Sequence, residues 1–492
     1  MPWTRHCHPR PPLVRRARGP YGLGSNESAV PAAAKPDREE TPVRPPASDR
    51  VHETVAALKD KGVDVVRVTY PDLIGTDRGR DVLIDHLPSV SEHGLAFCRA
   101  VYHTTPRGET LAVAGGLDAG LPDVCVHPEL ETIRPIPWEP GVAWCLGETT
   151  DPATGQLAPE GPRSVLRNVL ARMQKETGLR PVVGPELEYF LCVPDGSGGW
   201  KRYGEATGNV YVAGRRGDPD GHLLRTLRHL AALGIGATTG NHEYSSGQFE
   251  INLHHSEALD AADRAYLFKA SIKELARMDG MLATFMAKPF NDEGGSGFHM
   301  HMSALDQNGD NVFDDPAGPY GLSKTAGHAI AGILRHAPGI AALLNPTVNS
   351  YKRFGPDTLA PWLIDWGLDN RSAMVRIPPE RGPGARLEVR LGDASANPYL
   401  GTAALVAAAH LGVRDQLEPP APLEGYGYDA TKSPVLPGSL AEALDAFAAD
   451  AELVALLGKE FADAFLTYKR DEVSRYTHHV SDWEFAEYAY HL

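Results

Sequence analysis

The chain has 492 residues, more than one compact core accommodates, so we expect two domains and an appendage. Its content of 42% hydrophobic and 23% charged residues is that of an ordinary globular protein. The net charge of −15 argues against a nucleic-acid partner, and the lack of an apolar run of about 18 residues argues against a membrane span.

The first 50 residues differ in composition from the rest of the chain. They hold ten prolines, and nine Lys or Arg against five Asp or Glu, with no helix or strand period. An Arg-rich start is also typical of an organelle transit peptide. The prolines and the missing amphipathic period favour a disordered, dispensable tail at 1–50. We therefore predict that the folded sequence begins near Val51.

Five cysteines are scattered along the chain and never form a CxxC pair. This spacing argues against a disulfide framework and against a structural zinc site. The N-terminus also lacks the apolar stretch of a secretory signal. Together these features predict a protein of the reducing cytoplasm.

Residues 51–150 have the pattern of a small mixed domain. Residues 52–61 predict a helix that a glycine closes, and residues 63–70 predict a strand because they alternate and are rich in β-branched side chains. A return strand is expected from about Val82. The turn-rich residues 151–155 mark the boundary to a second domain.

The second domain is expected to cover residues 151–492. Strands and helices alternate there without the regular spacing of a parallel βαβ sheet. The C-terminal part is predicted to be helical. Ser439 and Glu442 form a capping-box pattern there, just ahead of an apolar stripe.

Two strand-like motifs each place a pair of polar side chains on one face. In GPELEYF, Glu186 and Glu188 project together because residues two apart share a face of a strand. In GSGFHMHMS, His299 and His301 do the same after a glycine-rich loop, which lets the backbone approach a ligand closely. Taken alone, each pair also fits a solvated strand or a set of core histidines.

The same alternation of polar and apolar residues recurs later in the chain. The further alternating sets are Gln248, Glu250 and Asn252, and then Arg386, Glu388 and Arg390, while residues 370–376 supply two more arginines, Arg371 and Arg376. One inward polar face of an antiparallel barrel would explain all these sets together. Oxygen ligands without thiolates favour Mg²⁺ or Mn²⁺, and several arginines suit a polyphosphate. The chain has no GxxxxGK[ST] loop, which excludes a P-loop enzyme.

The chain resembles the glutamine synthetase family in seven ordered motifs: GPELEYF, NHEYSSGQFE, GSGFHMHMS, NPTVNSYKRF, NRSAMVRIP, RLEVR and SANPYL. The resemblance covers residues 51–492 and implies an α+β fold. It implies a small N-terminal β-grasp domain and a C-terminal antiparallel β-barrel catalytic domain flanked by helices. It also implies an ATP-dependent ligase with two Mg²⁺ or Mn²⁺ ions per site, which converts glutamate into a γ-glutamyl amide. The expected assembly is a homo-oligomeric ring, a dodecamer of two stacked hexamers.

The resemblance implies roles for individual residues. The first metal ion would be held by Glu188, Glu243 and Glu250, and the second by Glu186, His299 and Glu388. The residues expected to contact ATP are His301, Ser303 and Arg386, and those expected to steady the transferring phosphate are Arg371 and Arg376. The residues expected to hold the amino acid are Gly295, Arg353 and Arg390. Asp72 would reach the site of a neighbouring subunit and help to deprotonate the amine, beside Glu243.

The chain departs from the family pattern where the amine should lie. Leu359 stands where ammonia-using members carry a glutamate. Asn241 and Gly294 replace a histidine and an asparagine. We therefore expect an organic amine as the nucleophile. The alternatives are an ammonia-using glutamine synthetase, with Asp357 in place of the missing glutamate, and a non-catalytic relative.

Overall fold

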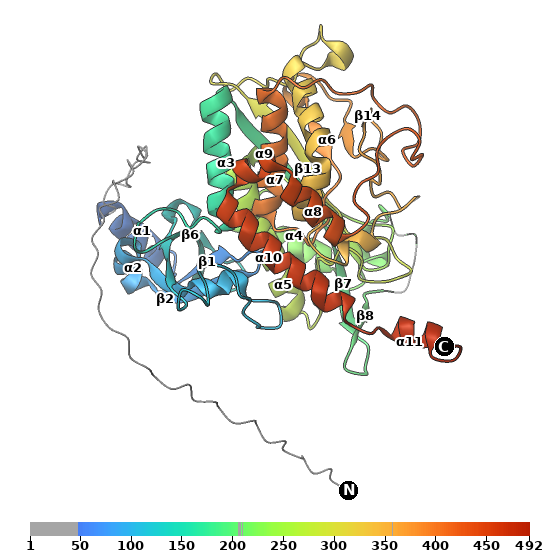
Figure 1. The fold of residues 1–492 in the computed structure, drawn as a ribbon. Coiled ribbons are helices and arrows are strands. Elements are labelled where there is room, and N and C mark those ends of the chain that lie inside the picture. The colour runs from blue at the N-terminus through green and yellow to red at the C-terminus, as the bar shows by residue number, and fades with distance from the viewer. Residues whose placement is uncertain (1–47, 205–207, 209, 357) are drawn as a thin grey trace, which may run out of the picture. The chain divides into compact units, whose positions relative to one another are not determined.

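The computed structural model describes residues 48–492 except 205–207, 209 and 357. Residues 1–47 of the predicted tail lie outside the described residues, so their disorder stays a prediction, whereas residues 48–50 begin α1 and belong to the folded chain. Two β-sheets and the helices around them make up the described part (Figure 1). None of the helices described is long and apolar enough to cross a membrane.

The first sheet is curled and has six strands in the order β2-β1-β6-β4-β3, with β5 beside β6. The strands are β1 (Val65–Pro71), β2 (Asp77–Leu83), β3 (Leu95–Cys98), β4 (Asp123–Pro128), β5 (Arg134–Pro135) and β6 (Val142–Thr150). β1 and β6 run parallel, and the other pairs are antiparallel. The helices α1 (Ser48–Asp60) and α2 (Leu87–His93) pack on each other beside this sheet.

The predicted helix and first strand of this region are confirmed as α1 and β1. The return strand β2 begins at Asp77, earlier than expected. The side chain of Asp72 explains the early return. Its carboxylate accepts the backbone N–H groups of Ile74 at 3.1 Å and Thr76 at 2.9 Å, which closes a tight turn directly after β1.

The second sheet has ten strands, and β7 (Arg180–Pro194) lies at its centre. The main order is β14-β15-β16-β13-β7-β10-β9, and three short strands also pair with β7. The remaining bounds are β8 (Trp200–Arg202), β9 (Ala237–His242), β10 (Gln248–Leu253), β11 (Ser256–Glu257), β12 (Leu282–Thr284), β13 (Phe298–Leu305), β14 (Trp366–Leu368), β15 (Val375–Ile377) and β16 (Leu387–Val389).

The expectation of a purely antiparallel second sheet is wrong, because β14 and β15 pair in parallel. Asp365 provides the reason. Its side chain accepts the N–H of Met374 at 3.0 Å, and its backbone carbonyl accepts the N–H of Val375 at 3.1 Å. These bonds bring the chain back to the start of β14, so β15 leaves in the same direction. The second sheet is therefore mixed.

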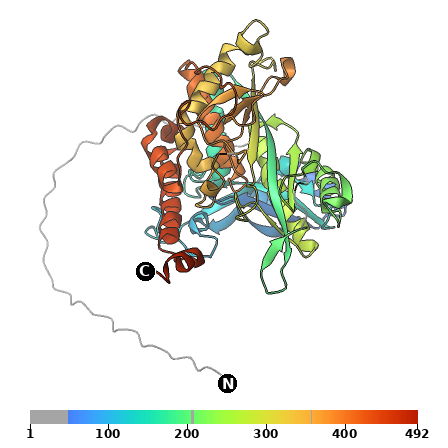
Figure 2. The same cartoon turned by 90° about the vertical axis from the view of Figure 1, so that its right-hand side faces the viewer.

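Helices flank the second sheet, as expected. Figure 2 shows the orange and red C-terminal helices on one side of the green and yellow strands. Helix α7 packs against α6, α3 and α9, and α5 packs against β7 and β12. The bounds are α3 (Pro162–Thr177), α4 (His222–Leu233), α5 (Ala258–Met278), α6 (Lys324–Leu344), α7 (Pro398–Arg414), α8 (Leu440–Ala449), α9 (Ala451–Leu457), α10 (Lys459–Thr477) and α11 (Asp482–Tyr488).

One of the two hydrogen bonds of the capping box predicted for α8 is present. Ser439 accepts the N–H of Glu442 at 3.2 Å. The carboxylate of Glu442 accepts the N–H of Gly438 at 2.8 Å instead of the N–H of the serine. A complete capping box, which the sequence analysis did not identify, begins α11 at Ser481 and Glu484.

Candidate active site

Strand register brings the predicted polar pairs into one patch. Glu188 lies opposite Glu250 of β10, and Glu186 lies opposite His299 of β13. Leu187, between the two glutamates, is fully buried in the core. Because side chains alternate along a strand, the polar residues share the other face. The expectation that these pairs lie on one face is confirmed.

The next strands extend this patch with a charged row. His301 of β13 and Arg376 of β15 both lie opposite Glu388 of β16. Arg376 forms an ion pair with Glu388, and Arg390 binds the same carboxylate at 2.6 Å. Burial works to raise the pKa of Glu388, but Arg390 and the other neighbouring cations outweigh it and hold the pKa at about 2. Glu388 is therefore ionised.

Two groups of side chains in the patch suit a metal ion, because one ligand atom from each member lies within 4.8 Å of the others. The first group is Glu186, His299 and Glu388, which is one of the two predicted ligand sets. The second is Glu188, Glu250 and His299. Glu243, which was expected in that set, belongs to neither group. Its carboxylate instead accepts a hydrogen bond from Asn241 at 2.9 Å.

The carboxylates of the patch crowd one another. Burial, followed by the charge of Glu186, raises the pKa of Glu250 to about 10. Burial, followed by the charge of Glu188, raises the pKa of Glu243 to about 7. A divalent cation between such groups would remove their repulsion and favour the ionised forms. Carboxylate oxygens with one histidine nitrogen suit Mg²⁺ or Mn²⁺, so the residues present fit a divalent ion in the first group, whereas the second predicted ligand set stays a proposal.

Gly297 lets the backbone approach these ligands closely. A Cβ atom there would lie 2.7 Å from His299 Nε2 and 3.1 Å from Glu188 Oε1. The N–H of Gly297 donates to the Glu188 carboxylate at 2.9 Å, as does the Gln248 side chain. The glycine-rich lead-in therefore orients a ligand side chain as well as leaving space.

The arginines expected to hold glutamate are buried close to the patch. Arg353 and Arg390 are each 6% exposed. Within the described residues Arg353 forms no ion pair, and its guanidinium reaches only the Leu391 carbonyl at 3.5 Å. A Cβ at Gly295 would lie 2.7 Å from Arg353 Cγ, so the predicted glycine is in contact with the predicted arginine. A buried guanidinium without a carboxylate partner suits an anionic substrate group.

The residues expected to contact ATP lie along the same strands. Arg386 Nε donates to His301 Nδ1 at 3.2 Å, and Ser303 follows two positions later on β13. His255 also lies here, since the Cβ atoms of both His255 and His301 would border a Cβ placed at Gly184. The sequence analysis missed His255. Its signal was the His254-His255 pair that directly follows the polar face of β10.

Two other predicted residues are exposed: Arg371, and Leu359, which is 45% exposed and has a φ of 59°. The backbone N–H of Tyr211 donates to His242 at 3.1 Å. Burial, followed by the charge of Glu243, raises the pKa of the Tyr211 phenol. Asp357, the alternative to the missing glutamate, lies outside the described residues.

Asp72 is held inward by its own turn in the described chain. Its side chain is 1% exposed and pairs with Arg78 at 2.9 Å, in addition to the two N–H groups of its own turn. These three donors hold the carboxylate inward. Its described hydrogen-bond partners do not include any residue of the polar patch. A role for Asp72 in a neighbouring subunit therefore requires this turn to rearrange, and it stays a proposal.

The chain matches a known catalytic domain over most of its length. The model of the glutamine synthetase catalytic domain matches residues 159–488. The chain belongs to the glutamine synthetase family. Glutamine synthetase of Halobacterium salinarum is 32% identical over 452 residues, which cover 90% of this chain and 97% of the relative. The Rhizobium meliloti glutamine synthetase is 35% identical over 441 residues, which cover 87% and 96%.

Solved structures of the glutamine synthetase family agree with this fold. A complex of GmaS with ADP has a TM-score of 0.79 and 32% identity, covering 89% of this chain and 99% of GmaS. GmaS without ligand has a TM-score of 0.77 and 32% identity, covering 88% and 99%. Membership of the glutamine synthetase family makes the chain an ATP-dependent ligase of that type, in a family that uses divalent metal ions.

Proposed function

We propose that this ligase joins an organic primary amine to the γ-carboxylate of glutamate through a γ-glutamyl phosphate. Leu359 carries the proposal, because it places an apolar side chain where ammonia-using members have a carboxylate. Overall sequence identity does not distinguish an organic-amine ligase from an ammonia-using glutamine synthetase. The chain is 32% identical both to a protein named glutamine synthetase and to GmaS.

Two Mg²⁺ or Mn²⁺ ions, when bound, would bridge and neutralise the phosphates of ATP. The residues proposed to hold them are Glu186, Glu188, Glu243, Glu250, His299 and Glu388. His301, Ser303 and Arg386 are proposed to bind ATP. The positive charges of Arg371 and Arg376 would stabilise the negative charge that spreads over the transferring phosphoryl group. Gly295, Arg353 and Arg390 would hold glutamate.

The reaction then proceeds in two steps. An oxygen of the substrate γ-carboxylate attacks the terminal phosphorus, and the bond from that phosphorus to ADP breaks. The amine nitrogen then attacks the acyl carbon, the carbon–oxygen bond to phosphate breaks, and the amine gives up a proton. Glu243 is the proposed acceptor, because it lies close to the metal-binding glutamates and its pKa is raised to about 7. Asp72 of a neighbouring subunit is the second proposed acceptor.

The amine preference follows from the size and charge of the nucleophile. Ammonium needs several oxygen acceptors, and losing a charged partner for a buried cation costs a few kcal/mol, or about a hundredfold in binding. An alkyl chain on the amine would instead contact Leu359 and gain about 0.8 kcal/mol for each buried methylene. A primary alkylamine, amino alcohol or polyamine should therefore compete well with ammonia.

The test compares kcat/KM for ammonium, ethylamine, ethanolamine and putrescine, measured as phosphate release with glutamate and ATP. We expect at least one organic amine to exceed ammonium by tenfold or more, the order set by the energies above. Leu359→Glu should shift the ratio toward ammonium. Leu224→Glu, at an exposed leucine of α4, is the matched control and should leave it unchanged.

Each alternative has its own outcome in this assay. A clear preference for ammonium would make the chain an ordinary glutamine synthetase, and the argument from Leu359 would be wrong. If the protein releases no phosphate with any amine, with or without Mg²⁺ or Mn²⁺, the chain would be a non-catalytic relative. We also propose that the protein is cytoplasmic and forms a ring-shaped homo-oligomer. The assignment of a β-grasp domain and of a barrel domain is part of the same proposal.

A further inference from the structure

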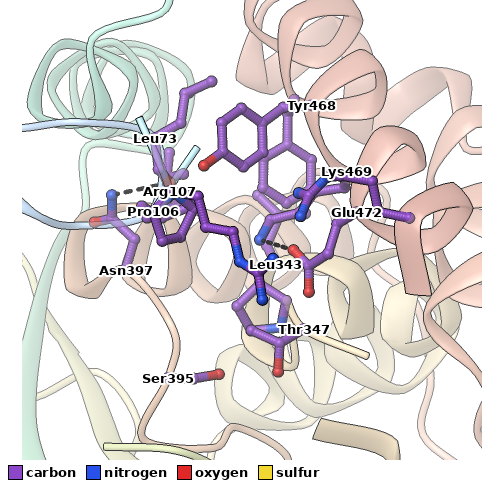
Figure 3. Close-up of a pocket in the computed structure, with 15 residues that line it drawn as sticks. Leu73, Pro106, Arg107, Leu343, Thr347, Ser395, Asn397, Tyr468, Lys469 and Glu472 are labelled. Carbon is purple, nitrogen blue, oxygen red and sulfur yellow. Dashed lines mark hydrogen bonds and ion pairs between the residues drawn. The ribbon is translucent and has the colours of Figure 1, made fainter. Parts of the chain in front are cut away.

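A separate cavity of about 340 Å³ lies between α10 and two loops of the N-terminal region, at residues 73–74 and 106–107 (Figure 3). Leu73 and Arg107 line it from the N-terminal side, Thr347 lines it from the segment after α6, and Lys469 and Glu472 line it from α10. None of its lining residues is among those proposed to bind metal, ATP or glutamate, and Leu73 belongs to the turn that follows Asp72. The cavity joins parts of the chain that are far apart in sequence.

The floor of the cavity is apolar. Leu73, Leu343, Leu400 and Phe465 line it, and each is about 1% exposed. Ligand pockets in proteins are mostly lined by such side chains, with a few polar groups that orient the ligand, and begin at about 300 Å³. The size therefore suits a small metabolite with an apolar body.

The rim of the cavity carries one uncompensated positive charge. The carboxylate of Glu472 is already engaged by Lys469 at 2.9 Å and by the N–H of Val348 at 3.1 Å. Arg475 pairs with Asp471 at 2.6 Å. Arg107 has no ion pair among the residues that the structure describes. Figure 3 shows its side chain extending across the cavity toward Thr347.

The loop that carries Arg107 is held in place. Thr104 and Thr110 form a β-bridge at its base, and the Tyr468 hydroxyl of α10 donates to the Thr104 carbonyl at 3.2 Å. Within the loop, the N–H of Gly108 donates to the Thr105 carbonyl at 2.9 Å. The backbone that supports Arg107 is therefore arranged before any ligand arrives, which lowers the entropy cost of binding.

We propose that this cavity binds a small aliphatic carboxylate at a site distinct from the active site. The carboxylate would pair with the fork of Arg107, and the alkyl body would lie on Leu343, Leu400 and Phe465. The apolar floor favours such a ligand over inorganic phosphate, which has no group to place there. Because the ligand would contact both the N-terminal segment and α10, its binding should raise the unfolding temperature.

The test uses butyrate as the probe on the full-length protein, with isothermal titration calorimetry and thermal unfolding as readouts. We expect saturable binding of butyrate and about tenfold weaker binding of acetate, which lacks two methylenes. Arg107→Gln should weaken butyrate binding at least tenfold. Arg228→Gln, at an exposed arginine of α4 outside the cavity, should leave it unchanged.

A carboxylate probe can also enter the glutamate site, so one further variant separates the two. Arg390→Gln, which alters the proposed glutamate site, should bind butyrate as the wild type does. Loss of binding in Arg390→Gln would place the probe in the active site and overturn the inference. Equal affinity of Arg107→Gln and wild type, or no saturable binding by the wild type, would overturn it as well. None of these outcomes depends on which amine the enzyme uses.

Discussion

Single carboxylates in the polar patch differ in how well they are neutralised. Glu388 is paired with two arginines, and Glu186 pairs with His299 at 2.8 Å. In the described part of the chain, Glu188 and Glu250 have no ion pair. Burial and the charge of Glu186 raise the pKa of Glu250, so its ionised form in particular would be favoured by a metal ion.

Glu188→Ala should abolish ATP-dependent amide formation, because it removes a ligand of the proposed metal pair. It should also cost about 1–3 kcal/mol of unfolding free energy, since the Gln248 side chain and the N–H of Gly297 lose their acceptor. Glu188→Gln is the matched control, because it keeps an acceptor while losing the charge. We expect it to be inactive but as stable as the wild type in urea unfolding. Undiminished amide formation in either variant would contradict the assignment.

Lys269 provides a test of pH dependence at a residue away from the metal ligands. Its ammonium donates to the carbonyls of Ala394 and Ala396, both at 2.8 Å, in the segment between Arg390 and α7. Burial lowers the pKa of Lys269 to about 7, whereas the unfolded chain keeps this proton up to about pH 10.5. Between these values the unfolded state binds more protons, so the contribution of Lys269 to stability rises with pH.

Lys269→Met removes this titration. The gap in unfolding free energy between wild type and variant should therefore grow by about 2 kcal/mol in favour of the wild type from pH 7 to pH 9. Urea unfolding at the two pH values measures it, and Lys459→Met, at an exposed lysine of α10, is the control. A gap that does not change with pH would show that Lys269 stays protonated in the folded protein.

At the scale of elements, the segment 423–436 holds together two loops of the active site. The N–H of Ile364 donates to the Pro434 carbonyl at 2.8 Å. The N–H of Gly427 donates to Ser372 Oγ at 2.8 Å, next to Arg371. The Tyr428 hydroxyl donates to the Ala360 carbonyl at 3.1 Å, next to Leu359. The conformation of the loop that carries Leu359 therefore depends on Tyr428.

Tyr428→Phe should raise KM for the preferred amine severalfold and reduce discrimination against ammonium, because the loop with Leu359 loses its tether. The loss of one hydrogen bond of about 1 kcal/mol sets this magnitude. KM for ATP should stay unchanged, which separates an effect on this loop from general damage to the fold. Tyr488→Phe, at a tyrosine of α11 that is 47% exposed, is the control. Equal changes in the KM values of ATP and amine would contradict the prediction.

At the scale of the whole molecule, the C-terminal end exposes a group of large apolar side chains. Trp483, Phe485, Tyr490 and Leu492 are 65% to 97% exposed. The capping box at Ser481 shows that α11 is a formed helix rather than a loose end. Exposed apolar groups of this kind mark protein–protein contacts, and a second copy of the chain fits the proposed ring.

A chain that ends at Thr477 should therefore form a smaller particle than the full chain in light scattering. The double variant Trp483→Ser and Phe485→Ser should do the same, because it removes the two aromatic contacts and keeps the helix. Glu487→Gln, on the same helix, is the control for a polar change. A particle of unchanged size in both altered chains would show that α11 does not contribute to assembly.

The amino-acid sequence alone determined the strand motifs and the shared face of their polar side chains. Alternation along a strand is a local property, so Glu186 with Glu188 and His299 with His301 could be paired before any fold was known. The ordered motifs also predicted the family, which the comparisons confirm. The predicted helix and strand at the start of the folded chain follow from equally local signals.

Only the tertiary structure decided which of these faces meet and which residues turn away from them. The register of β7, β10 and β13 joins Glu188, Glu250 and His299, and it leaves Glu243 on Asn241. The cavity with Arg107 needs five segments that are distant in sequence. Contacts between distant residues depend on how whole elements pack, and no local period of the sequence records that packing.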